Sequence, residues 1–488
     1  MATLPDNVAV AQRSGRSADL EAKRALPRAL MGGTAAMQAA GVQFLPKHKA
    51  ETEDTYKARL YGNTLFNAFK DAVLKQTGKL FAKPVALNDD VPPALVELSE
   101  NIDGQGRALT PFAMDATQHA MVDGVSYILV EFPVMTPAAG QTVVTYADQK
   151  ATGARPYWVL LTAGQMLGWR TEDRGGTQRL TQVRFTETIT RASGEYGEET
   201  VERVRVLFPG RYEVWEPTKT QTTSGSRQYV LVEEGATTNS EIMLAPVYTN
   251  RVGLLEGEPP LSALAELNQE HWVSSSENRH ALTFLRFAMI AFTGFSQEEV
   301  NQVVVGPDKG IAVPVGGTVG YVEHSGEGIE AGFSDIDRIE TRMQSAGMTV
   351  RIEGAGSVTA TTSAINSAES NASLKAVAKG LEDSLAQALQ FTAELLNIDD
   401  GGTVTVYDGF AEPPPTATVD ELLKLRATNN VSRATLWDIL KQRAVLPEDF
   451  DADDESERLA GDLALDLGPP PAASTFPPKQ EDDEDAPT

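Results

Sequence analysis

Histidines, carboxylates and glycine-rich turns are the groups in this chain that could do chemistry, and their spacing argues against it. His271 and His280 lie on one expected helix but nine residues apart, whereas two metal ligands on one helical face stand four apart. The other three histidines are isolated along the sequence. We interpret all five as packed or solvated side chains.

Three aspartates near the C-terminus match the first half of a calcium-binding loop, at Asp449, Asp451 and Asp453. The sixth position of such a loop is glycine and the twelfth is glutamate, but here they are Asp454 and Ala460. We therefore interpret the segment as a solvated acidic run.

Phosphate-binding and nucleophile motifs are missing as well. The chain has no GxxxxGK[ST], GxSxG or HExxH sequence and no cysteine. Gly326–Gly328 lacks a third glycine at the required spacing, and Gly354–Gly356 precedes no dinucleotide-binding unit, so both predict turns. We expect no enzyme activity, cofactor or metal. A hydrolase with paired carboxylates stays as an alternative, although the many acids contain no distinguishable pair.

The net charge of −26 over 488 residues is distributed unevenly. Residues 1–83 hold 13 Lys/Arg against 7 Asp/Glu, and residues 448–488 hold 2 against 14. Phosphate neutralisation requires Lys and Arg, so a chain this acidic should not grip nucleic acid broadly, although it could surround DNA. Seven arginines in the β-rich part predict scattered surface charge, with a subunit contact or a nucleic-acid patch as alternatives: Arg107, Arg155, Arg170, Arg174, Arg179, Arg184 and Arg191.

Periodicity and composition predict an α+β chain of more than one module. Residues 1–41 form a partly helical arm, residues 55–79 and 111–123 are helices, and residues 125–132 are a buried strand. Short apolar runs between glycine, serine and threonine turns predict an antiparallel sheet over residues 156–248. The N-terminus has no long apolar run, so we expect no signal peptide.

The second half predicts long helices separated by small-residue segments. A helix runs from Pro259 to about Phe292, and a short β-rich insertion with many glycines follows it. A further helix then leads into a loop of small residues, and a helix about 50 Å long begins at Ala364. The loop contains little bulk, so it suits sliding contact better than gripping.

These pieces, taken in order, resemble the portal proteins of tailed bacteriophages over roughly residues 41–454. No single piece is diagnostic, and the resemblance rests on their order: Leu45–Lys47, Glu53, Tyr56, Arg59–Leu60, Asn67, Gly124–Val130, Arg155–Tyr157, Leu167–Arg170, Pro246–Tyr248, Leu264, Leu267–Asn268, Ser275–Ser276 and Asn278.

The resemblance implies a portal fold with wing, helical stem, small β-rich clip, tunnel loop, long helix and C-terminal helical crown. Its implied boundaries are an N-terminal arm at 1–41, a wing at 42–255, a wing and stem helix at 256–295, a clip at 296–332, a stem helix at 333–350, a tunnel loop at 351–363, a long wing helix at 364–398, a strand and spacer at 399–419, crown-like helices at 420–466 and a disordered acidic tail at 467–488.

The resemblance also implies a function without catalysis. Portal proteins form a ring, usually of twelve copies, at one capsid vertex, through which double-stranded DNA is packaged and ejected. The implied partners are terminase, a tail adaptor or connector and the major capsid protein, with no membrane, and the implied location is the virion after assembly in the host cytoplasm. A minor capsid or scaffolding protein is the alternative. The implied DNA-channel residues are Arg351, Glu353, Gly354, Gly356, Ser357, Thr359, Thr361, Thr362 and Ser363.

Overall fold

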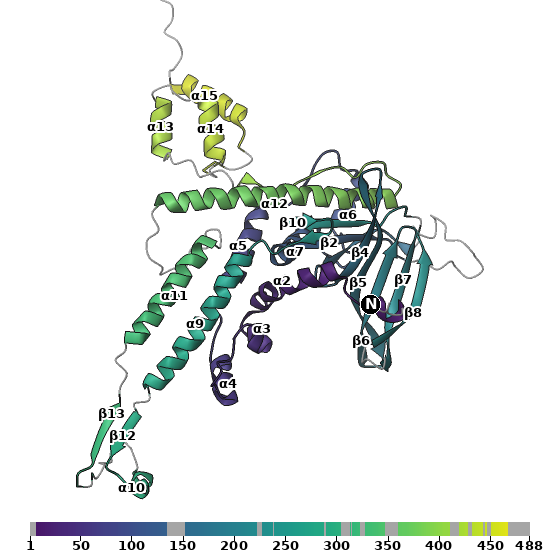
Figure 1. Cartoon of the computed structure of the whole chain (residues 1–488). Coiled ribbons are helices and arrows are strands. Elements are labelled where there is room, and N and C mark those ends of the chain that lie inside the picture. Colours follow the sequence, from purple (N-terminus) through teal and green to yellow (C-terminus); the bar gives the residue numbers. More distant parts are fainter. Residues whose placement is uncertain are drawn as a thin grey trace, which may run out of the picture. The chain divides into compact units, whose positions relative to one another are not determined.

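The computed structural model describes residues 6–133, 152–221, 227–237, 239–286, 289–303, 313, 315–322, 327–346, 360–409, 419–427, 432–442, 445–446 and 450–466 (Figure 1). Helices and strands are both abundant, which confirms the predicted α+β class. The chain divides into two compact units, Met1–Glu412 and Pro413–Thr488.

The N-terminal arm is helical and packs against the rest of the first unit. It consists of α1 (Asp6–Ala9), α2 (Gly15–Met31), α3 (Gly33–Ala40) and the 3-10 turn η1 (Gly41–Gln43). Ser14 caps α2 by accepting a hydrogen bond from the Ser17 backbone N–H. The arm is thus a folded part of the unit.

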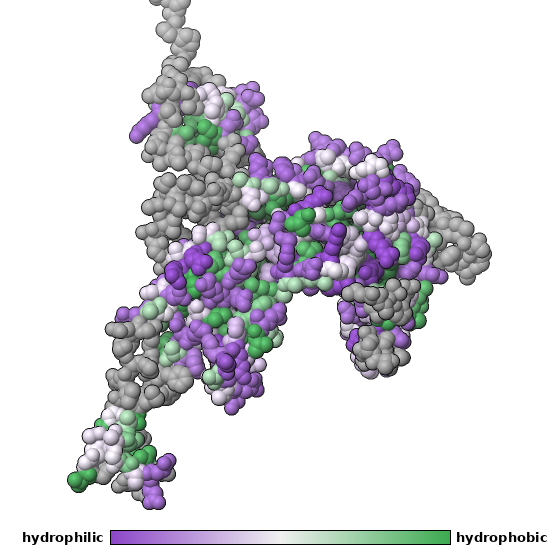
Figure 2. All heavy atoms as spheres, in the orientation of Figure 1, coloured by the Kyte–Doolittle hydropathy of each residue, from purple (hydrophilic) through white to green (hydrophobic). Residues whose placement is uncertain are grey.

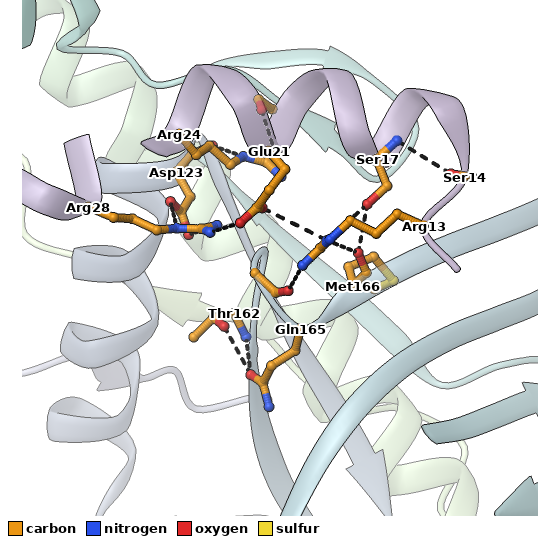
Figure 3. Close-up of polar contacts among 12 residues, drawn as sticks. Arg13, Ser14, Ser17, Glu21, Arg24, Arg28, Asp123, Thr162, Gln165 and Met166 are labelled. Carbon is orange, nitrogen blue, oxygen red and sulfur yellow. Dashed lines mark hydrogen bonds and ion pairs between the residues drawn. The ribbon is translucent and has the colours of Figure 1, made fainter. Parts of the chain in front are cut away.

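Arginines on α2 hold the arm in place (Figure 3). The buried Arg24 donates to the carbonyl oxygens of Asp123 (2.8 Å) and Gly257 (2.7 Å), and burial lowers its pKa from the usual value. Arg28 forms ion pairs with Asp123 and with Glu21. One helix therefore joins the turn after α7 (Leu109–Asp123) to the short strand β11 (Glu256–Gly257).

A three-stranded antiparallel sheet occupies the centre of the first unit. Its order is β3–β2–β9, formed by β3 (Tyr157–Thr162), β2 (Val125–Glu131) and β9 (Leu244–Tyr248). Strand β2 is buried on both faces, as its unbroken apolar run predicts. One face meets α7 and α12 (Ala360–Leu395) in an apolar core, and the other packs against part of the second sheet.

The second sheet has five antiparallel strands in the order β4–β5–β6–β7–β8, each joined to the next along the chain. They are β4 (Met166–Arg174), β5 (Thr177–Ser193), β6 (Gly197–Phe208), β7 (Arg211–Gln221) and β8 (Arg227–Ala236). This confirms the antiparallel sheet predicted for residues 156–248. The residue Val10 after α1 packs on one face of the sheet, against Val204 and Val206.

The remaining elements of the first unit are mostly helices. Helices α4 (Glu53–Tyr61) and α5 (Ala68–Leu80) share a core with α9 (Ser262–Arg286) and α11 (Glu327–Ala346). The short elements are β1 (Ala86–Leu87), α6 (Pro93–Ser99), β10 (Arg251–Gly253), β12 (Met289–Thr293), α10 (Gln297–Gln302), β13 (Thr318–Val322) and β14 (Val404–Thr405).

The second unit contains α13 (Val419–Ala427), α14 (Arg433–Gln442) and α15 (Ala452–Asp466). All three agree with the helices predicted over residues 420–466. Part of the acidic run interpreted as a solvated segment begins α15, whose first turn holds three carboxylates, where they interact favourably with the helix dipole. The tail at 467–488 lies outside the described residues.

Candidate functional site

The segments predicted as stem, clip and long helix contain consecutive elements between residues 262 and 395: α9, the β12–β13 hairpin, α11 and α12 (Figure 1). The limits of two of these helices differ from the predicted helix limits. Helix α9 ends at Arg286, and residues 289–293 are a strand although the sequence predicted helix to about Phe292. Helix α11 begins at Glu327, inside the predicted clip. Apolar residues at 287–292 fit a helix or a strand equally well, which explains the error.

Helices α9 and α11 pack side by side in opposite directions. Residue numbers fall along α11 as they rise along α9 in the contacts between them: Arg342 donates to Glu270 (3.5 Å), His271 Nε2 lies 3.2 Å from Glu340, Ser274 donates to Asp335 (3.4 Å), and Asn278 lies against Gly332. Most of this seam is polar. Its apolar part is the fully buried Trp272 with Ile339 and Met343.

Glycine at position 332 permits a close approach of the two helices. A Cβ atom there would overlap the side-chain oxygen of Asn278. The resemblance places Gly332 at the end of the predicted clip, whereas it lies inside α11, where a glycine often has a packing reason.

Amide side chains fix α9 to α5 and to the segment between α4 and α5. The buried Asn268 accepts from the Phe69 backbone N–H (3.0 Å) and donates to the Phe66 carbonyl oxygen (2.8 Å). Asn63 donates to the Trp272 carbonyl oxygen (2.8 Å). These bonds hold the N-terminal half of α9, while the described contacts of its C-terminal half are sparser.

An ion pair that the sequence analysis missed supports the same region. Arg59, on α4, donates to both carboxylate oxygens of Glu51 (2.9 Å each) and to the Pro46 carbonyl oxygen. The arginine side chain is 1% exposed and the glutamate 5%. The hydrogen bonds from Arg59 lower the pKa of Glu51 to about 2. Ser276 on α9 in turn donates to the Arg59 carbonyl oxygen (3.4 Å).

The helix pair is acidic, and its described arginines have partners. Helices α9 and α11 carry eight Asp/Glu, four Arg and no Lys. Arg338 pairs with Asp335 (2.6 Å) and Arg342 with Glu270 (3.5 Å), while Arg279 donates to the Gly62 carbonyl oxygen (3.5 Å). A phosphate near this surface would meet excess negative charge and arginines that carboxylates already partner.

The hairpin lies at one end of the helix pair because of its short connections. Only residues 287–288 separate α9 from β12, and only residues 323–326 separate β13 from α11. Strand β12 pairs with β13 from Met289 opposite Val322 to Thr293 opposite Thr318. Val300, Val313 and Val315 are exposed. Strand β13 agrees with the β-rich insertion predicted here, and residues 304–312 and 314 lie outside the described residues.

Helix α12 is held along its C-terminal half. The Trp158 indole donates to Thr392 (2.8 Å), Ser384 donates to the Pro246 carbonyl oxygen (2.8 Å), and Glu382 accepts from the Val406 backbone N–H (2.9 Å). Leu381, Leu385, Ala388 and Leu389 are fully buried. The helix has 36 residues, about 54 Å at 1.5 Å each, so its start lies far from these anchors.

Most of the predicted tunnel loop lies outside the described residues, including Arg351, Glu353, Gly354, Gly356, Ser357 and Thr359. Thr361, Thr362 and Ser363 belong instead to the first turn of α12, which begins at Ala360 and not at Ala364. Residues 347–359, between the end of α11 at Ala346 and the start of α12 at Ala360, lie outside the described residues.

The scattered arginines of the β-rich part have structural partners in several cases. Arg184 donates to the carbonyl oxygens of Ala9 and Val10, Arg155 to that of Asn101, and Arg107 pairs with Asp115. Arg191 pairs with Glu216. These four arginines therefore hold the chain together, and they do not form one continuous basic patch.

A cleft of about 820 Å³ lies between the β4–β5 hairpin, β9 and α12. Its charged lining is mixed, with Arg174, Arg179 and Arg251 alongside Glu172, Glu241 and Asp383. Within the described ranges, no group of His, Asp or Glu could hold a metal ion. No described helix is long and apolar enough to cross a membrane.

Comparison with known proteins covers the candidate segment. Residues 260–396 match the model of a domain of unknown function, DUF4055, and this range runs from the start of α9 to the end of α12. No curated protein matches the chain.

Three similar solved structures come from gene transfer agent (GTA) particles, each 12% identical to this chain. A chain of the native GTA virion has a TM-score of 0.38, covering 88% of this chain and 99% of that one. A chain from the neck of the empty particle, computed with C6 symmetry, gives 0.40 with 86% and 98% covered. A chain from the native neck, computed with C12 symmetry, gives 0.39 with 82% and 95%.

Proposed function

We propose that this chain is a phage-type portal protein that forms a closed ring around a DNA channel at one capsid vertex. In this proposal α9 and α11 form the stem, the β12–β13 hairpin belongs to the clip, and the segment before α12 lines the channel. The chain performs no catalysis. Genome packaging, genome ejection and the joining of head to tail pass through the ring.

The observation that carries the proposal is the antiparallel helix pair with a hairpin at one end and a long, one-sidedly anchored helix at the other. Anchors at Trp158, Pro246 and Val406 hold the C-terminal half of α12. The start of α12 at Ala360 therefore lies about 54 Å from the far end of the helix. This arrangement suits a loop that must project to a fixed radius.

Charge and the hairpin support the proposal independently. The acidic helix pair would repel DNA phosphates, so DNA could slide past without sticking. A lone two-stranded sheet is only marginally stable in water, and hydrophobic surface is exposed where this hairpin lies (Figure 2), with Val313 and Val315 exposed in the segment before β13. Neighbouring copies in a ring would cover such residues.

The proposed partners are further copies of the chain in a dodecameric ring, double-stranded DNA in the channel, terminase during packaging, a tail adaptor afterwards, and the major capsid protein around the wing. The proposed location is the virion, after assembly in the host cytoplasm.

A single-cysteine experiment tests the channel assignment, because the natural chain has no cysteine to compete. Thr361→Cys lies at the start of α12 and Glu394→Cys at its end, where the side chain is exposed. Each assembled variant is treated with a bulky maleimide, and DNA packaging is then measured. We expect the label at position 361 to block packaging and the label at position 394 to leave it unchanged.

The opposite pattern, or equal packaging in both labelled variants, would contradict the channel assignment. Assembly without any ring, seen by electron microscopy, would instead favour a minor capsid or scaffolding role.

A further inference from the structure

The two edges of the five-stranded sheet are treated differently. The β4 edge is covered by the N-terminal arm, where the Ser14 backbone N–H donates to the Leu167 carbonyl oxygen (2.8 Å). Arg13 and Ser17 donate to the Met166 carbonyl oxygen (2.8 and 2.7 Å) (Figure 3). The polar backbone groups at the start of β4 are thereby satisfied.

The β8 edge has no such cover in the part of the chain that the structure describes. No described strand pairs with β8 on the side away from β7. Helix α1 contacts β8, yet Val230 and Val232 stay 49% exposed and Leu231 stays 38% exposed. Residues 228–236 contain neither Pro nor Lys, two of the residues with which proteins often protect an open edge, and one irregularity at Val232 shifts the register with β7.

Apolar side chains are exposed on both faces of this edge, because neighbouring residues of a strand point to opposite sides. Leu231 lies opposite Trp215 of β7, and Val230 lies opposite Glu216. Strand β7 therefore covers these side chains from one side only. An extended segment laid along β8 would cover both faces at once and would also satisfy the outward backbone groups.

The charges at the two ends of β8 say what such a segment should carry. Glu234 stands directly opposite Glu213, and like charges in cross-strand positions destabilise a sheet. Glu213 is engaged by Arg211, whereas no side-chain partner of Glu234 lies among the described residues. Arg227, at the other end of β8, likewise has no described ion-pair partner. The edge is thus negative at its C-terminal end and positive at its N-terminal end.

We propose that β8 is a docking edge for an extended segment of another protein, which adds as a sixth, antiparallel strand. The segment has alternating apolar residues, with Lys or Arg near its N-terminal end to meet Glu234 and an acid near its C-terminal end to meet Arg227. This inference does not depend on the ring or on the DNA channel.

The test uses the full-length chain and two labelled nine-residue peptides. The first begins with two lysines, alternates valine and threonine, and ends with a glutamate. The second peptide has the same core, but it begins with the glutamate and ends with the two lysines. Binding is followed by fluorescence anisotropy, and its location by hydrogen–deuterium exchange of residues 227–236. We expect the first peptide to bind at least about tenfold more tightly, as a charge-assisted contact worth about 1.4 kcal/mol would require, and to protect β8.

Variants distinguish this edge from general stickiness. The double change Val230→Lys and Val232→Lys should weaken binding of the first peptide about tenfold or more. Val252→Lys, at a valine that is 50% exposed in the separate strand β10, should not. Glu234→Lys should reverse the preference between the peptides, and because that side chain is exposed the fold should survive.

The proposal would be overturned if the β8 amides were not protected from hydrogen exchange at saturating peptide. It would also be overturned if both peptides bound equally, or if Val252→Lys weakened peptide binding as much as the double change in β8. A failure of the ring or channel experiments would leave this result unaffected, so the two proposals fail separately.

Discussion

The core around α12 and the seam between α9 and α11 use opposite means to hold long helices. Helix α12 packs its leucines and alanines into an apolar core, with the hydrogen bond from Trp158 to Thr392 inside it. The α9–α11 seam is mostly ion pairs and amide contacts, with Trp272, Ile339 and Met343 as its apolar part. Apolar packing gives one well-determined geometry, whereas polar contacts at a partly exposed seam contribute little stability each.

This difference separates a part of the chain that is rigid by itself from a part that, under the proposed function, neighbouring copies would complete. The apolar core around β2 and α7 positions α12 within this chain. The helix pair and its hairpin expose Phe333, Val313 and Val315 and have a weaker seam, which is the behaviour expected of a part completed by assembly.

The largest expected effect comes from the apolar core. Leu385→Ala removes a fully buried side chain of α12 and should lower the free energy of unfolding by about 3–4 kcal/mol. Phe333→Ala, at a residue that is 48% exposed, should change it by less than about 1 kcal/mol in the unassembled chain. Urea denaturation of both variants measures this. Equal losses would contradict the division into a rigid core and an assembly-dependent pair.

Loss of the ion pair between Arg59 and Glu51 should have the next largest effect on the free energy of unfolding, and this effect should depend on pH. The folded pKa of Glu51 is lowered to about 2, so its contribution is present above the unfolded value of 4.5 and is lost as the pH falls toward 2. Glu51→Gln leaves Arg59 buried without its partner and should cost about 2–3 kcal/mol at pH 7.

The stability difference between this variant and the natural chain should shrink between pH 4.5 and pH 2, because the natural carboxylate is then protonated as well. Thermal unfolding across this range is the measurement, with Glu53→Gln as the matched exposed control. A difference that stays constant with pH would show that charge is not the cause.

The helix seam itself should respond more weakly. Gly332→Ala should displace the side chain of Asn278, which the new methyl group would overlap, and cost up to about 1 kcal/mol, because the end of that flexible side chain can move aside. Gly78→Ala, in α5 with open space around it, should stabilise the chain by about 0.5–1 kcal/mol. Adding Asn278→Ala to Gly332→Ala should recover most of the loss, and no recovery would mean that the close approach is not the reason for the glycine.

The smallest stability effect should come from the exposed pair of Arg338 with Asp335. Asp335→Asn should alter the free energy of unfolding by less than about 0.5 kcal/mol. It also frees an arginine on the acidic helix pair, so retention of DNA by the assembled protein should rise, most clearly at low salt. Asp19→Asn, an exposed change on the N-terminal arm, is the control for DNA retention. Unchanged retention would argue that the pair does not face DNA.

The sequence predicted the element order well because the helices are long and periodic and the strands are bounded by turns. Helix α7, strand β2 and the antiparallel sheet follow from such local patterns. The end of α9 was misplaced because the apolar residues at 287–292 suit a helix or a strand, and the start of α11 was missed because Gly326 and Gly328 were interpreted as a turn, although Gly328 lies inside the helix.

Tertiary contacts could not be predicted in the same way. The pairing of Arg59 with Glu51 and the overlap that Gly332 avoids join segments whose approach no local pattern specifies. The uncovered β8 edge is visible only once strand order is known, since Val230–Val232 alone would fit a buried strand.

Electron microscopy of the purified full-length chain and of assembled particles tests the central claim most directly. We predict a closed ring with an axial channel, in which the N-terminal ends of the α12 helices point toward the axis and the five-stranded sheets lie at the periphery. A 52.5 kDa monomer at micromolar concentration with no ring in assembled particles, or a ring with the start of α12 on its outer rim, would contradict the account.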